Sequence, residues 1–295
     1  MKLSMHNWMR PEPIEVTLQR LARCGYDGIE ISGEPARYDS AYVRDLLQQH
    51  GLRAFGSVTL MTEGRDLIHE DRYVRIGTIQ YYKDCAKLVA DLGGDLLCLI
   101  PSTVGKTKPM ASPEEEWRWA VEGLREVVDY AGALGVRIGI EPLNRFETYF
   151  INRHDQALAL ADAVDPSVGV VLDAFHINIE EADPYAAIRA TGSRLVDFHV
   201  ADNNRYPPGQ GAWDWHKLIG TLREIGYTGP LTVEFVVPVD RTPAARRRIE
   251  GQAEEATTVG HEKFLRDHGT GILSAEYYEE CTRASAQYLR RLMSQ

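Results

Sequence analysis

Short apolar runs, often rich in β-branched residues, alternate along this chain with longer segments in which apolar residues recur three or four positions apart. The short runs are typical of buried parallel strands, and the longer segments are typical of amphipathic helices. The pattern predicts eight strands: Lys2–His6, Gly28–Ser32, Arg53–Thr59, Asp95–Ile100, Arg137–Pro142, Val168–Asp173, Leu195–Val200 and Leu231–Phe235.

Helical segments are expected between these strands, and their ends carry recognisable signals. Examples are Ile14–Cys24, Tyr42–His50, Tyr73–Leu92, Glu114–Leu134, Trp215–Ile225 and a final helix, Ala275–Met293. Four of these segments are followed by a glycine, which can adopt the left-handed conformation that closes a helix: Gly25, Gly51, Gly135 and Gly226. Ser112 precedes Pro113 and an acidic first turn, which predicts a capped helix start.

Eight strand–helix units in strict alternation predict an α/β chain folded as a (β/α)8 TIM barrel, one domain over residues 1–295. An open doubly wound sheet is the second interpretation, but the turn after the first strand lacks the expected glycines. Val237–Ser274 is far longer than an ordinary strand–helix loop. We interpret it as an insertion on the catalytic face that serves as a lid or as a docking loop for a partner.

Composition narrows the classes of function. Of the 295 residues 44% are hydrophobic, and the formal net charge is −10. That charge argues against nucleic-acid binding, which needs a basic surface. No apolar stretch is long enough for a membrane span, and the N-terminus lacks a signal-peptide core, so we expect a cytoplasmic protein. The four cysteines are scattered and indicate neither a disulfide scaffold nor a thiolate zinc site.

Four acidic or imidazole side chains stand at equivalent places, near the C-terminal ends of expected strands five to eight. They are Glu141, Asp173, His199 and Glu234. A barrel of this kind builds its active site at that face. Three carboxylates converging there would repel one another without a cation, and oxygen ligands with one imidazole suit Mn2+, Mg2+ or Co2+, with Zn2+ as a further option. We therefore predict one bound divalent metal, with Mn2+ as first choice.

Three segments around these residues resemble the signatures of the ketose 3-epimerases, a group of the xylose-isomerase-like sugar isomerase and epimerase superfamily. They are Glu141-Pro-Leu-Asn-Arg-Phe-Glu147, Leu172-Asp-Ala-Phe-His-Ile-Asn-Ile-Glu-Glu181 and His199-Val-Ala-Asp-Asn-Asn-Arg205. The resemblance implies a TIM barrel, a metal held by the four strand-end residues, and Glu141 and Glu234 as the acid–base pair. It also implies that Glu147, His176 and Arg205 contact substrate oxygens around the reacting carbon.

Elementary chemistry is consistent with these roles. A proton beside a carbonyl becomes removable when a divalent cation stabilises the developing cis-enediolate. Inverting that carbon needs one carboxylate on each face, one to take the proton and one to return it. His6 and Trp8 close the first strand at the same face and are further candidates for substrate contact. The expected substrate is a sugar or sugar conjugate, and the expected assembly is a homo-oligomer.

Other activities use the same fold or the same proton abstraction. The chain also resembles the catalytic subunit of bacterial C-glycoside deglycosidases, which eliminate an aglycone from 3-keto C-glycosides and work with a small second subunit. Isomerisation of hydroxypyruvate or an inosose is a third member of the set. A DNA-repair endonuclease would need a histidine-rich metal cluster and a basic surface, which this chain lacks. A non-catalytic binding module would not need both Glu141 and Glu234.

Overall fold

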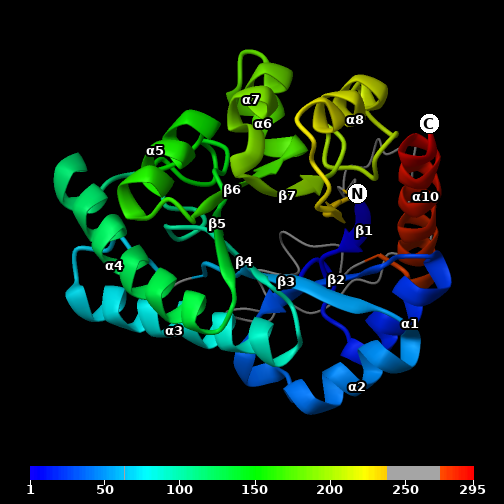
Figure 1. The fold of residues 1–295 in the computed structure, drawn as a ribbon, viewed down its shortest axis with the longest axis horizontal. Helices are drawn as coiled ribbons and strands as arrows, with labels where there is room; N and C mark the ends of the chain where they lie inside the picture. The colour runs from blue at the N-terminus through cyan, green and yellow to red at the C-terminus, as the bar shows by residue number, and fades with distance from the viewer. Residues whose placement is uncertain (63, 238–272) are drawn as a thin grey trace, which may run out of the picture.

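The eight strands form one parallel sheet that curls into a barrel, seen in the computed structural model of residues 1–62, 64–237 and 273–295 (Figure 1). Their order is β1-β8-β7-β6-β5-β4-β3-β2, and a bridge between His6 and Glu30 links the two outer members, β1 and β2. The strands are β1 (Lys2–Met5), β2 (Gly28–Gly33), β3 (Arg53–Thr59), β4 (Leu96–Leu99), β5 (Arg137–Ile140), β6 (Gly169–Asp173), β7 (Leu195–Val200) and β8 (Pro230–Val233). The predicted (β/α)8 barrel is confirmed, with strand ends displaced by no more than two residues.

Helices surround the strands on the outside of the barrel (Figure 1). They are α1 (Ile14–Cys24), α2 (Ser40–His50), α3 (Arg72–Asp91), α4 (Pro113–Ala133), α5 (His154–Val164), α6 (Ala174–Glu180), α7 (Pro184–Thr191), α8 (Trp215–Glu224) and α10 (Ala275–Ser294), with 3-10 turns η1 (Pro35–Arg37) and η2 (Gly192–Arg194). The helix boundary signals are confirmed. Gly25 closes α1 with φ 81°, and Ser112 forms a capping box with Glu115 at the start of α4.

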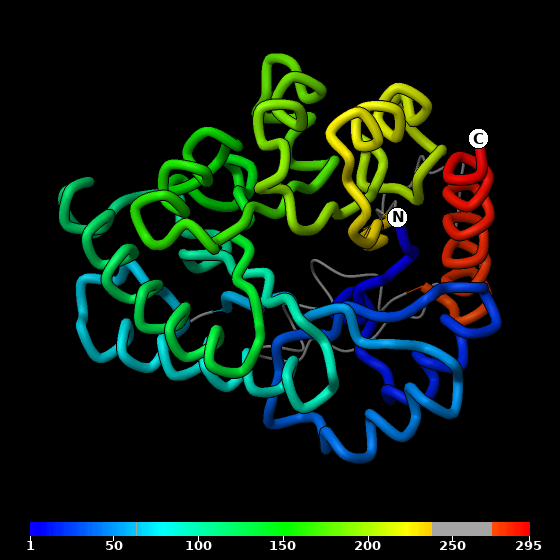
Figure 2. The backbone as a smooth tube through the Cα atoms, in the orientation of Figure 1, coloured from blue at the N-terminus to red at the C-terminus, as the bar shows by residue number. Residues whose placement is uncertain are grey.

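The last helix completes the ring of helices next to the first one. α10 packs against α1, α8 and β1, so the C-terminal end of the chain lies beside its N-terminal strand (Figure 2). Tyr278 and Leu289 are among its buried side chains. Helix α10 therefore covers the outside of the barrel next to β1, although the two elements are at opposite ends of the sequence.

Most of the predicted insertion lies outside the described residues. Of Val237–Ser274, only Val237, Leu273 and Ser274 lie within the described residues, and Val237 and Leu273 are buried. The lid or docking role of residues 238–272 lies outside the described residues and stays a prediction. None of the helices in the described part of the chain combines the length and the apolar composition that crossing a bilayer requires.

Candidate metal and active site

The four predicted metal ligands meet at the C-terminal end of the barrel. Glu141 directly follows β5, Asp173 ends β6, His199 is the penultimate residue of β7, and Glu234 directly follows β8. Main-chain bonds hold two of them in place: Glu141 N donates to Leu99 O at 3.0 Å, and Glu234 N donates to Val200 O at 3.0 Å. All four side chains are buried, because the strand ends bring them into the barrel mouth.

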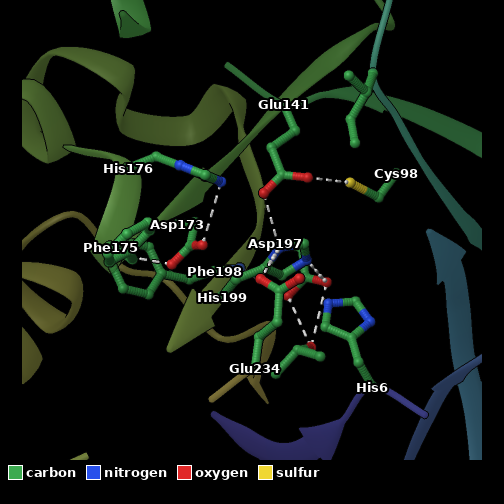
Figure 3. Close-up of polar contacts among 12 residues, drawn as sticks. His6, Cys98, Glu141, Asp173, Phe175, His176, Asp197, Phe198, His199 and Glu234 are labelled. Carbon is green, nitrogen blue, oxygen red and sulfur yellow. Dashed lines mark hydrogen bonds and ion pairs between the residues drawn. The ribbon is translucent and has the colours of Figure 1, made fainter. Parts of the chain in front are cut away.

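His199 lies between the two glutamates (Figure 3). Its Nδ1 is 3.0 Å from Glu141 Oε1 and 3.6 Å from Glu234 Oε2. The other oxygen of Glu141 accepts from the Cys98 thiol at 3.3 Å, and the other oxygen of Glu234 accepts from Trp8 Nε1 at 2.9 Å. Each glutamate is thus held at one oxygen and presents the second oxygen to the same imidazole nitrogen.

Asp173 contacts two basic side chains of the site, Arg205 and His176. One oxygen caps helix α6 by accepting from Phe175 N at 2.8 Å. The other oxygen pairs with Arg205 Nη1 and lies 3.6 Å from His176 Nε2. Ligand atoms of Glu141, Asp173 and His176 all lie within 4.8 Å of one another. The structure therefore brings His176, predicted as a substrate contact, near enough to be considered a ligand as well.

The predicted substrate contacts differ in where they lie. Trp8, Glu147, His176 and Arg205 line a cavity of about 280 Å³ together with Glu141 and Glu234. Asn144 Nδ2 connects two of them, at 2.8 Å from Glu147 Oε1 and 2.9 Å from His176 Nδ1. His6 does not line this cavity. Its ring lies edge-on to His199, with centroids 4.5 Å apart (Figure 3), and one of its ring nitrogens lies within 4.8 Å of ligand atoms of His199 and Glu234.

Most of the remaining cavity wall is apolar. These side chains come from loops and strand ends around the barrel mouth: Val58, Leu60, Met61, Ile100, Val104, Leu143, Phe175 and Val236. A concave apolar site with a few convergent polar groups is the usual form of a small-molecule site. The polar groups gather on one side of the cavity, at the glutamates and at Arg205.

Arg205 occupies a strained backbone position. Its φ of 64° makes it the single non-glycine residue with positive φ in the described part of the chain. Buried Asp202 holds the loop in this form, since its carboxylate accepts from Gly209 N at 2.8 Å, Trp213 N at 3.2 Å and Trp215 Nε1 at 2.9 Å. The Arg205 guanidinium then lies over the Phe175 ring, 4.5 Å from its centroid. Left-handed backbone at a non-glycine residue costs energy and is typically kept where function requires it.

Burial and neighbouring charges shift the pKa values of these groups in opposite directions. Burial raises the pKa of Glu234 to about 8, although Arg205 acts against this shift. Burial alone would raise the pKa of Asp173, but Arg205 and His176 outweigh it and lower that pKa. Burial alone would lower the pKa of His199, yet the carboxylates of Glu141 and Glu30 raise it well above its usual value. Burial and the charges of its neighbours therefore together set the pKa of each of these groups.

Sequence reasoning did not single out several residues that support this site. Glu30, Asp197 and Cys98 are buried around His199 and Glu141, and Asn144 and Asp202 hold the loops. Signals for two of them were present in the sequence. Glu30 interrupts the otherwise apolar run of the second strand, and Asp202 lies within the segment that ends at Arg205.

Comparison with known proteins agrees with the fold. Residues 18–257 match the xylose isomerase-like TIM barrel family. An L-ribulose 3-epimerase of Methylomonas sp. (strain DH-1) is 34% identical over 216 residues, 72% of this chain and 75% of the relative. A D-psicose 3-epimerase of Ruminiclostridium cellulolyticum is 30% identical over 283 residues, 91% of this chain and 93% of the relative. The solved structure of D-psicose 3-epimerase with D-tagatose from Clostridium cellulolyticum H10 is 25% identical, with a TM-score of 0.83 over 99% of both chains.

The chain therefore belongs to the xylose isomerase-like TIM barrel family. Within that family it belongs to the ketose 3-epimerase group, at about 30% identity over most of its length. Both steps confirm the family resemblance that the three segments around Glu141, Asp173 and His199 indicated.

Proposed function

We propose that this protein is a divalent-metal-dependent sugar epimerase that inverts the carbon next to the carbonyl of a ketose. The observation that carries this proposal is the placement of Glu141 and Glu234. Both line the same cavity, and both approach His199 Nδ1, from opposite sides (Figure 3). Two carboxylates that flank one point are what removal of a proton from one face and its return to the other require.

The residues present fit a metal. Glu141, Asp173, His199 and Glu234 offer three carboxylates and one imidazole, a donor set that suits Mn2+, Co2+ or Mg2+. The buried Oε2 of Glu234 has no hydrogen-bond partner among the described residues, as expected of an oxygen reserved for a cation. A divalent ion bound by these four side chains would polarise the substrate carbonyl and stabilise negative charge on its oxygen.

The remaining polar residues would hold the substrate. Arg205 can donate hydrogen bonds to an oxygen at the reacting carbon, while its stack on Phe175 keeps the guanidinium in the cavity wall. Glu147 and His176, tied together through Asn144, can bond neighbouring hydroxyl groups. Trp8 has two roles in this proposal, because it lines the cavity and its indole N–H orients Glu234.

A ketose is the substrate class that the relatives favour, since those compared above are an L-ribulose 3-epimerase and D-psicose 3-epimerases. We expect an enzyme of this kind to be a homo-oligomer. Elimination from a 3-keto C-glycoside begins with the same proton abstraction and is the alternative reaction, with a small second subunit as partner. The two reactions differ in product, so one screen separates them.

The test is a screen of the Mn2+-loaded protein against free ketoses in D2O. Deuterium should enter at C3, and the C3 epimer should appear. Glu141→Gln and Glu234→Gln should each abolish epimerisation, because each removes one of the two bases. Glu116→Gln is the matched control: Glu116 is buried but bonds Met110 N and Tyr149 OH outside the cavity. Release of an aglycone from a 3-keto C-glycoside, without epimerisation of any ketose, would replace this proposal by the elimination.

A further inference from the structure

Behind His199, on the side away from the cavity, lies a second set of buried carboxylates. His199 Nε2 is 3.4 Å from Glu30 Oε2 and 3.7 Å from Asp197 Oδ2. All three side chains are essentially inaccessible to solvent. The imidazole is therefore enclosed by acids at both nitrogens, with Glu141 and Glu234 of the proposed metal site at Nδ1 and a different pair, Glu30 and Asp197, at Nε2.

The two carboxylates at Nε2 are not equivalent. Asp197 already accepts from Phe198 N at 2.6 Å and lies within 3.5 Å of the hydroxyls of Tyr227 and Thr232. Neither carboxylate oxygen of Glu30 has a hydrogen-bond partner among the described residues. His199 Nε2 likewise has no hydrogen-bond partner among the described residues, and burying polar groups without partners is unfavourable. Two imidazole nitrogens lie close to Glu30 Oε2: His199 Nε2 at 3.4 Å and His6 Nε2 at 3.9 Å.

We propose that Glu30 is a positioning residue that accepts the Nε2 hydrogen of His199 and thereby directs the unprotonated Nδ1 toward the metal. The inference rests on the metal site of the proposed function. An imidazole binds a metal through a nitrogen that carries no proton, and the bond made by the other nitrogen decides which one that is. His6 supports the arrangement, because its ring lies edge-on against His199 and limits rotation of that ring.

A second cation between these residues would be the competing explanation, since ligand atoms of Glu30, Cys98 and His199 all lie within 4.8 Å of one another. Cys98 argues against it. Its thiol donates a hydrogen bond to Glu141 Oε2 at 3.3 Å, so Cys98 holds a glutamate of the proposed metal site rather than a second ion.

The experiment measures the affinity of the full chain for Mn2+ by the EPR signal of the free ion. Wild-type protein should bind one Mn2+. Outer partners of ligating histidines contribute about 10- to 100-fold to metal affinity. Glu30→Met, which cannot accept the hydrogen, should weaken binding by about 100-fold, and Glu30→Gln, which still offers a neutral acceptor of the same shape, by about 10-fold. Glu116→Gln controls for loss of a buried carboxylate elsewhere and should bind as wild type.

Each other outcome has a defined meaning. Wild-type affinity in a folded Glu30→Gln and Glu30→Met overturns the proposal, and so does a second Mn2+ per chain. If Glu30→Met does not fold, Glu30→Gln alone decides. A large loss in Asp197→Asn with none in Glu30→Gln assigns the positioning role to Asp197 instead. Failure of the wild-type protein to bind Mn2+ at all would reject the metal site of the proposed function, which is a separate result from equal binding by all variants.

Discussion

Truncation of Arg205 should destabilise the protein strongly without metal and much less with metal. Its guanidinium pairs with Asp173 and lies 3.6 Å from Glu234 Oε2, in a nearly enclosed position. Two charges about 4 Å apart interact by about 4 kcal/mol at an effective dielectric constant of about 20. Removal of one member of a buried ion pair typically costs about 3–5 kcal/mol, and we expect Arg205→Ala to lose that much in metal-free protein.

A bound divalent ion changes this result, because it neutralises the same carboxylates. With Mn2+ at saturation, Arg205→Ala should keep one metal per chain and lose less stability. Its kcat/KM should still fall about 10²- to 10³-fold, the effect of losing a group that stabilises developing negative charge. Arg205→Lys is the matched variant, since it keeps the charge and loses the planar fork. Both variants retain a side chain at φ 64°, so the backbone strain cancels in the comparison.

The assay is denaturant unfolding with EDTA and with Mn2+, combined with steady-state kinetics and metal analysis. Arg205→Lys should recover much of the metal-free stability but little of kcat/KM. An equal loss of stability with and without Mn2+ would refute the electrostatic reasoning, because the metal would then not share the carboxylates with Arg205. Loss of metal from Arg205→Ala would assign Arg205 a structural role in the metal site rather than a role toward the substrate.

Further results are expected from other substitutions, from metal removal and from changes of pH. His199→Ala should weaken Mn2+ binding, because it removes the imidazole at the centre of the ligand set, and chelation should abolish the activity of wild type until Mn2+ or Co2+ is added; an active preparation free of stoichiometric metal would contradict this. Because burial raises the pKa of Glu234 to about 8, Mn2+ affinity should increase as pH rises toward 8, by up to about tenfold per pH unit, whereas a flat profile from pH 6 to 8 would contradict it. The stability of the metal-free protein should change in the opposite direction. The Glu234 carboxyl, with a pKa of about 8 in the folded protein and about 4.3 in the unfolded chain, contributes its full stabilisation only below about pH 4.3. The free energy of unfolding should therefore decrease as pH rises from about 4.3 to about 8, as pH-dependent unfolding would measure. Asp202→Asn should lower kcat/KM while Mn2+ stoichiometry stays at one, because backbone donors that hold the Arg205 loop lose their charged acceptor; unchanged kinetics would show that the loop does not position Arg205.

The sequence by itself determined the barrel and the set of strand-end residues. Alternation of apolar runs with helical periodicity specifies parallel strands, and parallel strands deliver their C-terminal ends to one face. Glu141, Asp173, His199 and Glu234 could therefore be placed together from their positions alone. The three segments around them also indicated the family, since residue type and spacing agreed over each segment.

Tertiary structure alone decided which side chains meet inside the barrel. Glu30 lies on β2 and His199 on β7, yet the narrow interior brings Glu30 Oε2 to 3.4 Å from Nε2 of the imidazole. A strand pattern tells which side chains point inward but not their rotamers or their partners across the barrel. The same holds for His6, whose ring the structure places edge-on against that of His199. The left-handed backbone of Arg205 likewise depends on bonds from Asp202 that close only when the loop folds onto the barrel.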